Sequence, residues 1–75
     1  MSETSVYIEV AVKVEPLEPF RDLFIAQLGA LGFESFSENQ DGFEAYIIKE
    51  DFKIDSLQGA LQWEGVTSSY TIDEI

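Results

Sequence analysis

The first apolar pattern in the chain is a strict alternation over residues 5–14. Every second residue there is aliphatic, and the residues between them are polar, aromatic or small. A period of two is typical of a strand with one buried face. The residues expected on the buried face are Val6, Ile8, Val10, Val12 and Val14. The residues expected on the opposite face are Tyr7, Glu9, Ala11 and Lys13.

A helical pattern follows a proline-containing break. Pro19 suits the first turn of a helix, where its missing N–H has no partner to lose. Glu18 and Asp22 favour the positive end of the helix dipole. Gly32 predicts a left-handed cap that ends the helix. The apolar residues expected on one face of this helix are Phe20, Leu23, Phe24, Leu28 and Leu31.

The middle of the chain predicts a hairpin. Residues 33–38 and 43–49 are expected to form paired strands, and residues 39–42 supply the turn, which includes Asp41 and Gly42. Phe33 and Phe36 are expected to fill the core beneath the first helix.

The last third of the chain predicts a second, weaker helix and a final strand. The helical segment opens at Glu50, and Gly59 within it lowers its stability by roughly 1 kcal/mol relative to alanine. Gly65 follows, and residues 66–73 alternate as a strand. The apolar residues expected to share one face of the helix are Ile54, Leu57 and Leu61.

The resulting order, βαββαβ, predicts an α+β fold of the ferredoxin-like class. This fold is a four-stranded antiparallel sheet of order 4-1-3-2 with two helices on one face. On the uncovered face we expect Tyr46 and Ile48 beside Tyr7 and Glu9, because Ala45 and Ile47 fit more smoothly beneath helices. Such a face is a candidate docking surface. The competing interpretation is that the two tyrosines simply cover the sheet.

Composition limits the chemistry. The 75 residues make at most one domain, and the chain contains neither cysteine nor histidine. Disulfides, thiolate nucleophiles, most hydrolase triads and most zinc sites are therefore excluded. The N-terminus lacks the features of a signal peptide, and no apolar run is long enough to span a bilayer. We expect a cytoplasmic protein without a membrane partner.

The formal charge is −11, from 15 acidic and four basic residues. Such a surface repels nucleic-acid phosphates and anionic lipid. It either keeps a small domain soluble or attracts a basic partner, and both interpretations stay open. RNA binding is disfavoured because the lysines, arginines and basic-glycine-aromatic signature of RNA-binding relatives of this fold are missing. Acid pairs such as Glu34 and Glu38 need no catalytic role. No glycine-rich nucleotide or methyl-donor loop is present, so we expect that this chain alone is not an enzyme.

Several short stretches, distributed over essentially the whole chain, resemble a known family. The chain resembles the N-terminal domain of PrmA, the methyltransferase of the eleventh large-subunit ribosomal protein, in its Bacteroidetes-like form. The stretches that carry the resemblance are Tyr7-Ile8-Glu9-Val10, Gly32-Phe33-Glu34-Ser35-Phe36, Glu38, Asp41-Gly42, Ala45-Tyr46-Ile47, Phe52, Gly65-Val66, Ser69-Tyr70-Thr71 and Glu74-Ile75.

The resemblance implies a substrate-recognition module spanning residues 1–75 as a single domain. Its partners would be the basic ribosomal protein of the large-subunit stalk base and its own C-terminal catalytic domain. That catalytic domain, absent after Ile75, would bind S-adenosylmethionine, so no cofactor is expected in this chain. We expect a monomer that does not bind nucleic acid directly. The family offers no contact motif to transfer, so the partner-binding candidates rest on physical reasoning: Tyr7, Glu9, Glu34, Glu38, Tyr46 and Ile48.

Two other functions compete with recognition of a basic protein. Small ferredoxin-like domains also act as regulatory dimers that bind a small ligand between their sheets. A third interpretation is a structural module whose uncovered face packs against its own catalytic domain, in an interface of about 600–1,500 Å².

Overall fold

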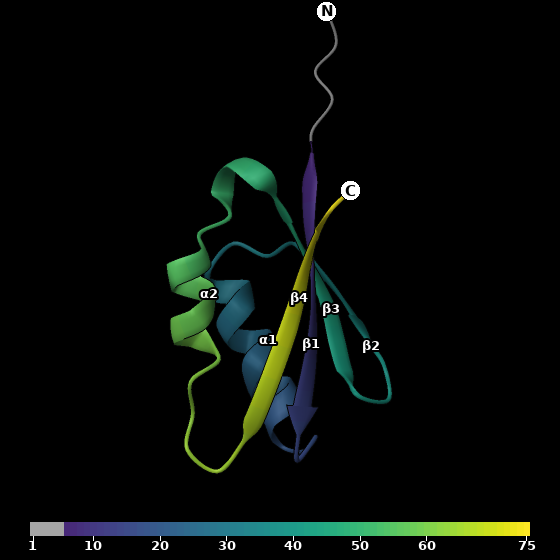
Figure 1. Cartoon of the computed structure of the whole chain (residues 1–75), viewed down its shortest axis with the longest axis vertical. Coiled ribbons are helices and arrows are strands. Elements are labelled where there is room, and N and C mark those ends of the chain that lie inside the picture. Colours follow the sequence, from purple (N-terminus) through teal and green to yellow (C-terminus); the bar gives the residue numbers. More distant parts are fainter. Residues whose placement is uncertain (1–5) are drawn as a thin grey trace, which may run out of the picture.

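The computed structural model describes residues 6–75, and over these residues it has the predicted order βαββαβ (Figure 1). A short 3-10 turn, η1 (Lys49–Asp51), joins the third strand to the second helix. The first residue of the predicted first strand, Ser5, lies outside the described residues. The main elements are β1 (Tyr7–Glu15), α1 (Phe20–Ala30), β2 (Ser35–Glu38), β3 (Gly42–Ile48), α2 (Ile54–Ala60) and β4 (Thr67–Glu74).

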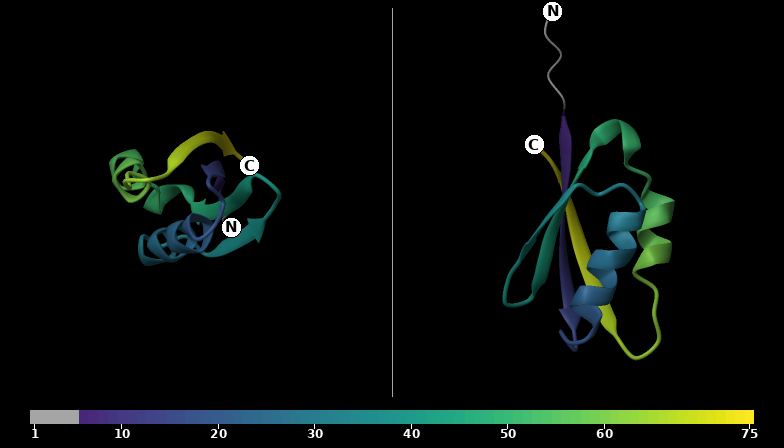
Figure 2. Two further views of the ribbon diagram at one scale, coloured as in Figure 1. Left: turned by 90° about the horizontal axis from the view of Figure 1, so that it is seen from below. Right: turned by 180° about the vertical axis from the view of Figure 1, so that it is seen from behind.

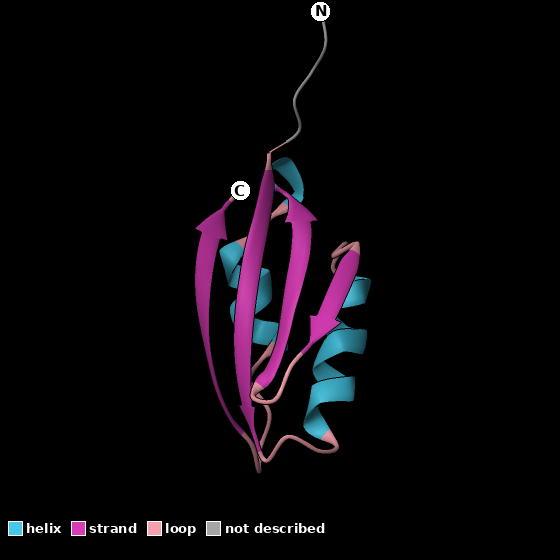
Figure 3. Cartoon of the chain, turned by 90° about the vertical axis from the view of Figure 1, so that its right-hand side faces the viewer, coloured by secondary structure: helices cyan, strands magenta, loops and turns pink. Residues whose placement is uncertain are grey.

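The four strands form one antiparallel sheet of order β2-β3-β1-β4, which is the predicted order read from the other edge. Both helices cover the same face, as the two views in Figure 2 show. Figure 3 shows the other face, with the helices behind the sheet. The predicted ferredoxin-like α+β sandwich is therefore confirmed.

The alternation of β1 decides which side chains enter the core. Its even-numbered residues from Ile8 to Val14 are all buried beneath the helices. β3 lies beside β1 in a register that pairs Val10 with Ala45 and Ile8 with Ile47, so these alanine and isoleucine side chains are buried too. Tyr46 and Ile48 consequently lie on the uncovered face, as predicted.

The helices contribute fewer core residues than the pattern predicted. In α1, Phe24 and Leu28 are fully buried, whereas Leu23 is 37% exposed and Leu31 is 36% exposed. Successive residues of a helix are about 100° apart, so Leu23 lies beside the buried stripe, while Leu31 follows the last helical residue. Ile54, the first residue of α2, is likewise 39% exposed.

Three aromatic rings extend the core beneath the hairpin. Phe33 is buried, and its ring centroid lies 6.5 Å from that of Phe36, which in turn lies 6.2 Å from that of Phe43. These separations lie in the favourable range for tilted aromatic pairs. The predicted core position is confirmed for Phe33, while Phe36 is half-buried at the edge of the cluster.

Side chains of the turn itself and of α1 stabilise the hairpin turn. The Asn39 Oδ1 atom accepts hydrogen bonds from the backbone N–H of Asp41 (2.9 Å) and of Gly42 (2.8 Å). The Arg21 guanidinium of α1 donates to the Asn39 carbonyl at 3.0 Å and lies 3.4 Å from a Glu38 carboxylate oxygen. These contacts stabilise the conformation of the turn and join it to α1.

Gly42, the first residue of β3, is required by close packing of the backbone. A Cβ atom at this position would lie 2.0 Å from the Val12 carbonyl oxygen in the neighbouring strand β1. We expect Gly42→Ala to lower the free energy of unfolding by about 1–3 kcal/mol because a backbone atom must move. Urea denaturation measures this change.

Two helical glycines provide the control. Apart from the adjacent residues and the backbone of the same helix, no atom lies within 4 Å of the position that a Cβ atom would take at Gly29 or Gly59. Gly29→Ala and Gly59→Ala are therefore expected to raise the unfolding free energy by about 0.5–1 kcal/mol, through helix propensity alone. Equal stability of Gly42→Ala and wild type would contradict the close packing.

Candidate functional site

The uncovered side of the sheet, called the open face below, carries the candidate site. Its side chains come from alternate residues of all four strands, as the strand registers require. The residues of the open face are Tyr7, Glu9, Ala11 and Lys13 of β1, Ser35 and Ser37 of β2, Glu44, Tyr46 and Ile48 of β3, and Thr67, Ser69, Thr71 and Asp73 of β4.

Two tyrosine–carboxylate pairs occupy one half of this face. The Tyr46 hydroxyl donates to Glu9 Oε2 at 2.8 Å, and the Tyr7 hydroxyl donates to Glu34 Oε1 at 3.0 Å. Glu9 and Tyr46 face each other across β1 and β3, and Tyr7 faces Ile48 in the same way. Five of the six predicted partner-binding residues are thus brought together.

Glu34 reaches this group through a local irregularity at the start of β2. Ser35 pairs with Tyr46, and the backbone N–H of Glu34 also donates to the Tyr46 carbonyl at 2.8 Å. Two consecutive residues therefore lie opposite Tyr46. This departure from simple alternation lets the Glu34 carboxylate meet the Tyr7 hydroxyl.

Glu38 does not join the group. It pairs with Phe43, so it lies on the helix side of the sheet, where its carboxylate contacts Arg21. The physical reason is strand parity, because Glu38 is three residues from Ser35 and side chains an odd number apart point to opposite faces. Arg21 thus has a neighbouring acid as its partner.

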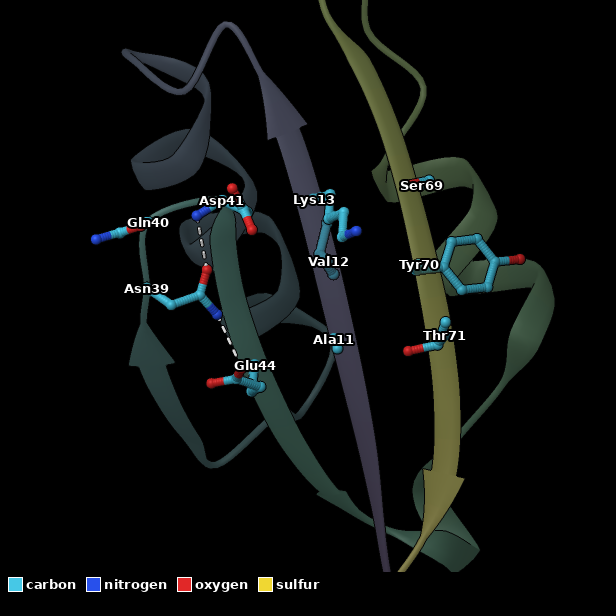
Figure 4. Close-up of a pocket in the computed structure, with 10 residues that line it drawn as sticks. All are labelled: Ala11, Val12, Lys13, Asn39, Gln40, Asp41, Glu44, Ser69, Tyr70 and Thr71. Atoms are coloured by element: carbon cyan, nitrogen blue, oxygen red, sulfur yellow. Dashed lines mark hydrogen bonds between the residues drawn. The ribbon is translucent and has the colours of Figure 1, made fainter.

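A hollow of about 590 Å³ occupies the other half of the open face (Figure 4). The hairpin turn borders it on one side and β4 on the other, with the small side chain of Ala11 and the ammonium group of Lys13 between them. The Asn39 amide donates to Glu44 Oε2 at 2.8 Å, which fixes one carboxylate at the rim.

The charge of the open face is strongly negative. Its strands carry Glu9, Glu44 and Asp73, the adjoining Glu34 adds a fourth carboxylate, and Lys13 is its only base. The chain's other three basic residues are in α1, in η1 and immediately before α2. Four carboxylates and one ammonium group give this face a net charge of −3, and the other 11 acidic residues of the chain lie elsewhere.

Glu44 and Asp73 were not among the residues predicted from the sequence to bind a partner. Glu44 could have been found by parity, because it is two residues before Tyr46 in the same strand. Asp73 could not have been placed beside Glu9 without the register of β4 against β1, which pairs these two residues.

Both tyrosine hydroxyls have a raised pKa. For Tyr46 the main cause is the hydrogen bond to Glu9, followed by burial and the negative charges of Glu9 and Glu44. For Tyr7 the main cause is the hydrogen bond to Glu34. The phenols therefore stay protonated at neutral pH, and the site provides hydrogen-bond donors, acceptors and half-buried aromatic rings.

Other kinds of site find little support in the described part of the chain. No group of three or more acidic side chains there is arranged to hold a metal ion. None of the helices in residues 6–75 combines the length and the apolar character needed to cross a membrane.

The tyrosine pairs lead to a prediction about pH. We expect Glu9→Gln to lower the pKa of Tyr46 toward its ordinary value of about 10 and to leave the pKa of Tyr7 unchanged. Because the phenol must be protonated to donate, the stability from this bond is present below pH 10 and is lost as pH rises through the raised pKa. Titration of the ring carbon shifts by NMR resolves each tyrosine.

Glu34→Gln is the matched control, and it is expected to lower the pKa of Tyr7 alone. A Tyr46 pKa that did not respond to Glu9→Gln would show that the Glu9–Tyr46 bond is absent in solution.

Comparison with protein-family models, with curated protein sequences and with solved structures found no match to this chain. The resemblance to PrmA therefore stays a prediction from the sequence.

Proposed function

We propose that this chain is a non-catalytic recognition module that binds a basic protein through the open face. The observation that carries the proposal is the charge of that face, where Glu9, Glu34, Glu44 and Asp73 are accompanied by Lys13 alone. A face of this kind gives a cationic partner a faster association rate and a preferred orientation.

The tyrosine–carboxylate pairs suit the recognition of lysine and arginine. Each carboxylate has about four acceptor positions, and Glu9 and Glu34 each use one for a tyrosine hydroxyl. The remaining positions can accept hydrogen bonds from an ammonium or guanidinium group. The half-buried rings of Tyr7 and Tyr46 offer cation–π contacts next to these carboxylates.

The same pairs argue against a catalytic role. A general base or nucleophile works best with a pKa near neutrality. The hydrogen bonds to Glu9 and Glu34 shift the pKa of both tyrosines in the opposite direction. The open face therefore fits binding better than proton transfer.

The resemblance to PrmA suggests which basic protein is bound. We propose the ribosomal protein of the large-subunit stalk base, presented to a separate domain that uses S-adenosylmethionine to methylate it. In this role the module works in the cytoplasm as a monomer and holds no cofactor. The negative charge of the open face is consistent with such a partner.

The hollow beside Lys13 favours a second candidate function, a regulatory domain that binds a small polar ligand. Its volume of about 590 Å³ lies within the range of ligand sites, about 300–1,000 Å³. Ligand sites are lined predominantly by hydrophobic and aromatic side chains, however, whereas seven of the ten residues that line this hollow are polar, among them Asn39, Glu44 and Thr71. We therefore place this function second.

The proposal predicts salt-dependent binding of the stalk-base ribosomal protein. Calorimetric titration should give saturable binding at low salt, with an affinity that decreases as salt is added, because the contacts are electrostatic. Glu9→Lys and Glu34→Lys are each expected to weaken binding by about tenfold or more, since a 1.4 kcal/mol loss is a factor of ten.

Glu64→Lys makes the same charge change outside the sheet, in the connection between α2 and β4, and should leave the affinity nearly unchanged. Equal losses in all three variants would indicate that only net charge matters. Undetectable binding to the folded wild-type domain would contradict the proposed function.

A further inference from the structure

Building on the proposed function, we propose that the free edge of β4 accepts an extended segment of a cationic polypeptide as a fifth strand. Among residues 6–75 no strand lies beyond β4. Figure 3 shows β4 as the outermost strand, next to the long central strand β1, with its outer edge uncovered along its length. An uncovered edge is a template for pairing with another chain.

The hydrogen-bond pattern shows which backbone groups are available. The Ile75 N–H donates to the Tyr7 carbonyl at 2.8 Å, so odd-numbered residues of β4 direct their backbone groups toward β1. The even-numbered residues direct theirs to the outer edge. The residues that present N–H and C=O groups there are Ser68, Tyr70, Ile72 and Glu74.

β4 has few of the features that usually protect an edge strand, and its charged residues, Asp73 and Glu74, lie at its C-terminal end. It is eight residues long, and it contains no proline, no lysine and no glycine. The opposite edge strand, β2, has only four residues. Thr67, Tyr70 and Ile72 are residue types with high strand propensity. Proteins blunt exposed edges of this kind, so the intact length of β4 indicates an edge that is used.

The acidic residues beside the β4 edge indicate that the bound segment is cationic. On the open face, Asp73 of β4 lies directly opposite Glu9 of β1, with Cβ atoms expected about 5 Å apart. Like charges in this arrangement are unfavourable without a nearby cation. Lys13, the only base on the open face, is four residues from Glu9 along β1, about 13 Å away. A lysine or arginine on a fifth strand would lie beside Asp73 and relieve this repulsion.

The side chains on the helix side of β4 determine which residue types fit at the alternate positions of the bound segment. These positions would lie beside Ile72, which is 38% exposed, and beside the half-buried Tyr70, so apolar side chains fit at them. The occupant is therefore a segment in which cationic and apolar residues alternate. A second copy of this chain is disfavoured, because each copy carries a net charge of −11.

Amide hydrogen exchange tests the fifth strand directly. The probe is a capped eight-residue peptide of alternating lysine and valine, and the control peptide has four lysines followed by four valines. At a saturating concentration of the alternating peptide, we expect hydrogen exchange of the Tyr70 and Ile72 amides to slow by about tenfold or more. The Ser69 and Thr71 amides should change little, because they are already directed toward β1.

An edge variant provides a second readout. Ile72→Pro removes an N–H that has no partner within the sheet and places a ring at the outer edge. Binding of the alternating peptide should weaken by about tenfold relative to the control variant Ile72→Ala. If the Ile72→Pro variant does not fold, hydrogen exchange of the wild-type chain still tests whether a peptide pairs with β4.

The possible outcomes separate the two proposals. Binding of both peptides without slower exchange at Tyr70 and Ile72 would overturn the edge proposal and leave the open face as the binding surface. Failure of both peptides to bind would count against a cationic partner and hence against the proposed function. Protection of the two amides that depends on protein concentration, without peptide, would instead assign the edge to a second copy.

Discussion

Hydrogen bonding of β1 on both of its sides is the constraint on which the rest of the structure depends. β3 and β4 pair with it along almost its whole length, and its isoleucine and valine residues all face the helices. Because side chains alternate, the burial of Ile8, Val10, Val12 and Val14 commits Tyr7, Glu9, Ala11 and Lys13 to the open face. The core and the candidate site are therefore two sides of one strand, and neither can shift register without the other.

Contacts within the β2–β3 hairpin fix the position of β3 against β1. Gly42 lets β3 approach the Val12 carbonyl, Asn39 closes the turn, and Arg21 joins the turn to α1. These contacts determine where Glu44 and Tyr46 lie on the open face. Tyr46 is hydrogen-bonded to Glu9 of β1, and Glu44 to Asn39 of the turn, so strands carry most of the site while connecting segments contribute Asn39 and Glu34.

The open face and the outer edge of β4 are different parts of one surface. The open face supplies charge and aromatic rings, which give orientation and attraction. The β4 edge supplies unpaired backbone groups, which recognise an extended chain through its main chain. Asp73 belongs to both, since it lies on the open face and on the edge strand. A cationic segment along β4 would place its charged side chains next to Asp73, which lies opposite Glu9, so the two surfaces can serve one partner.

Local patterns in the sequence were enough to predict the fold class, the order of the elements and most of the open face. The alternation of residues 5–14 and the glycine at position 32 act through backbone geometry, which neighbouring residues determine. Tertiary structure alone decided which residues meet across strands. Strand register placed Asp73 opposite Glu9, an irregularity at Ser35 brought Glu34 to Tyr7, and parity turned Glu38 toward Arg21. The exposure of Leu23 and Ile54 was also decided there, because Leu23 lies beside the buried stripe of α1 and Ile54 is the first residue of α2.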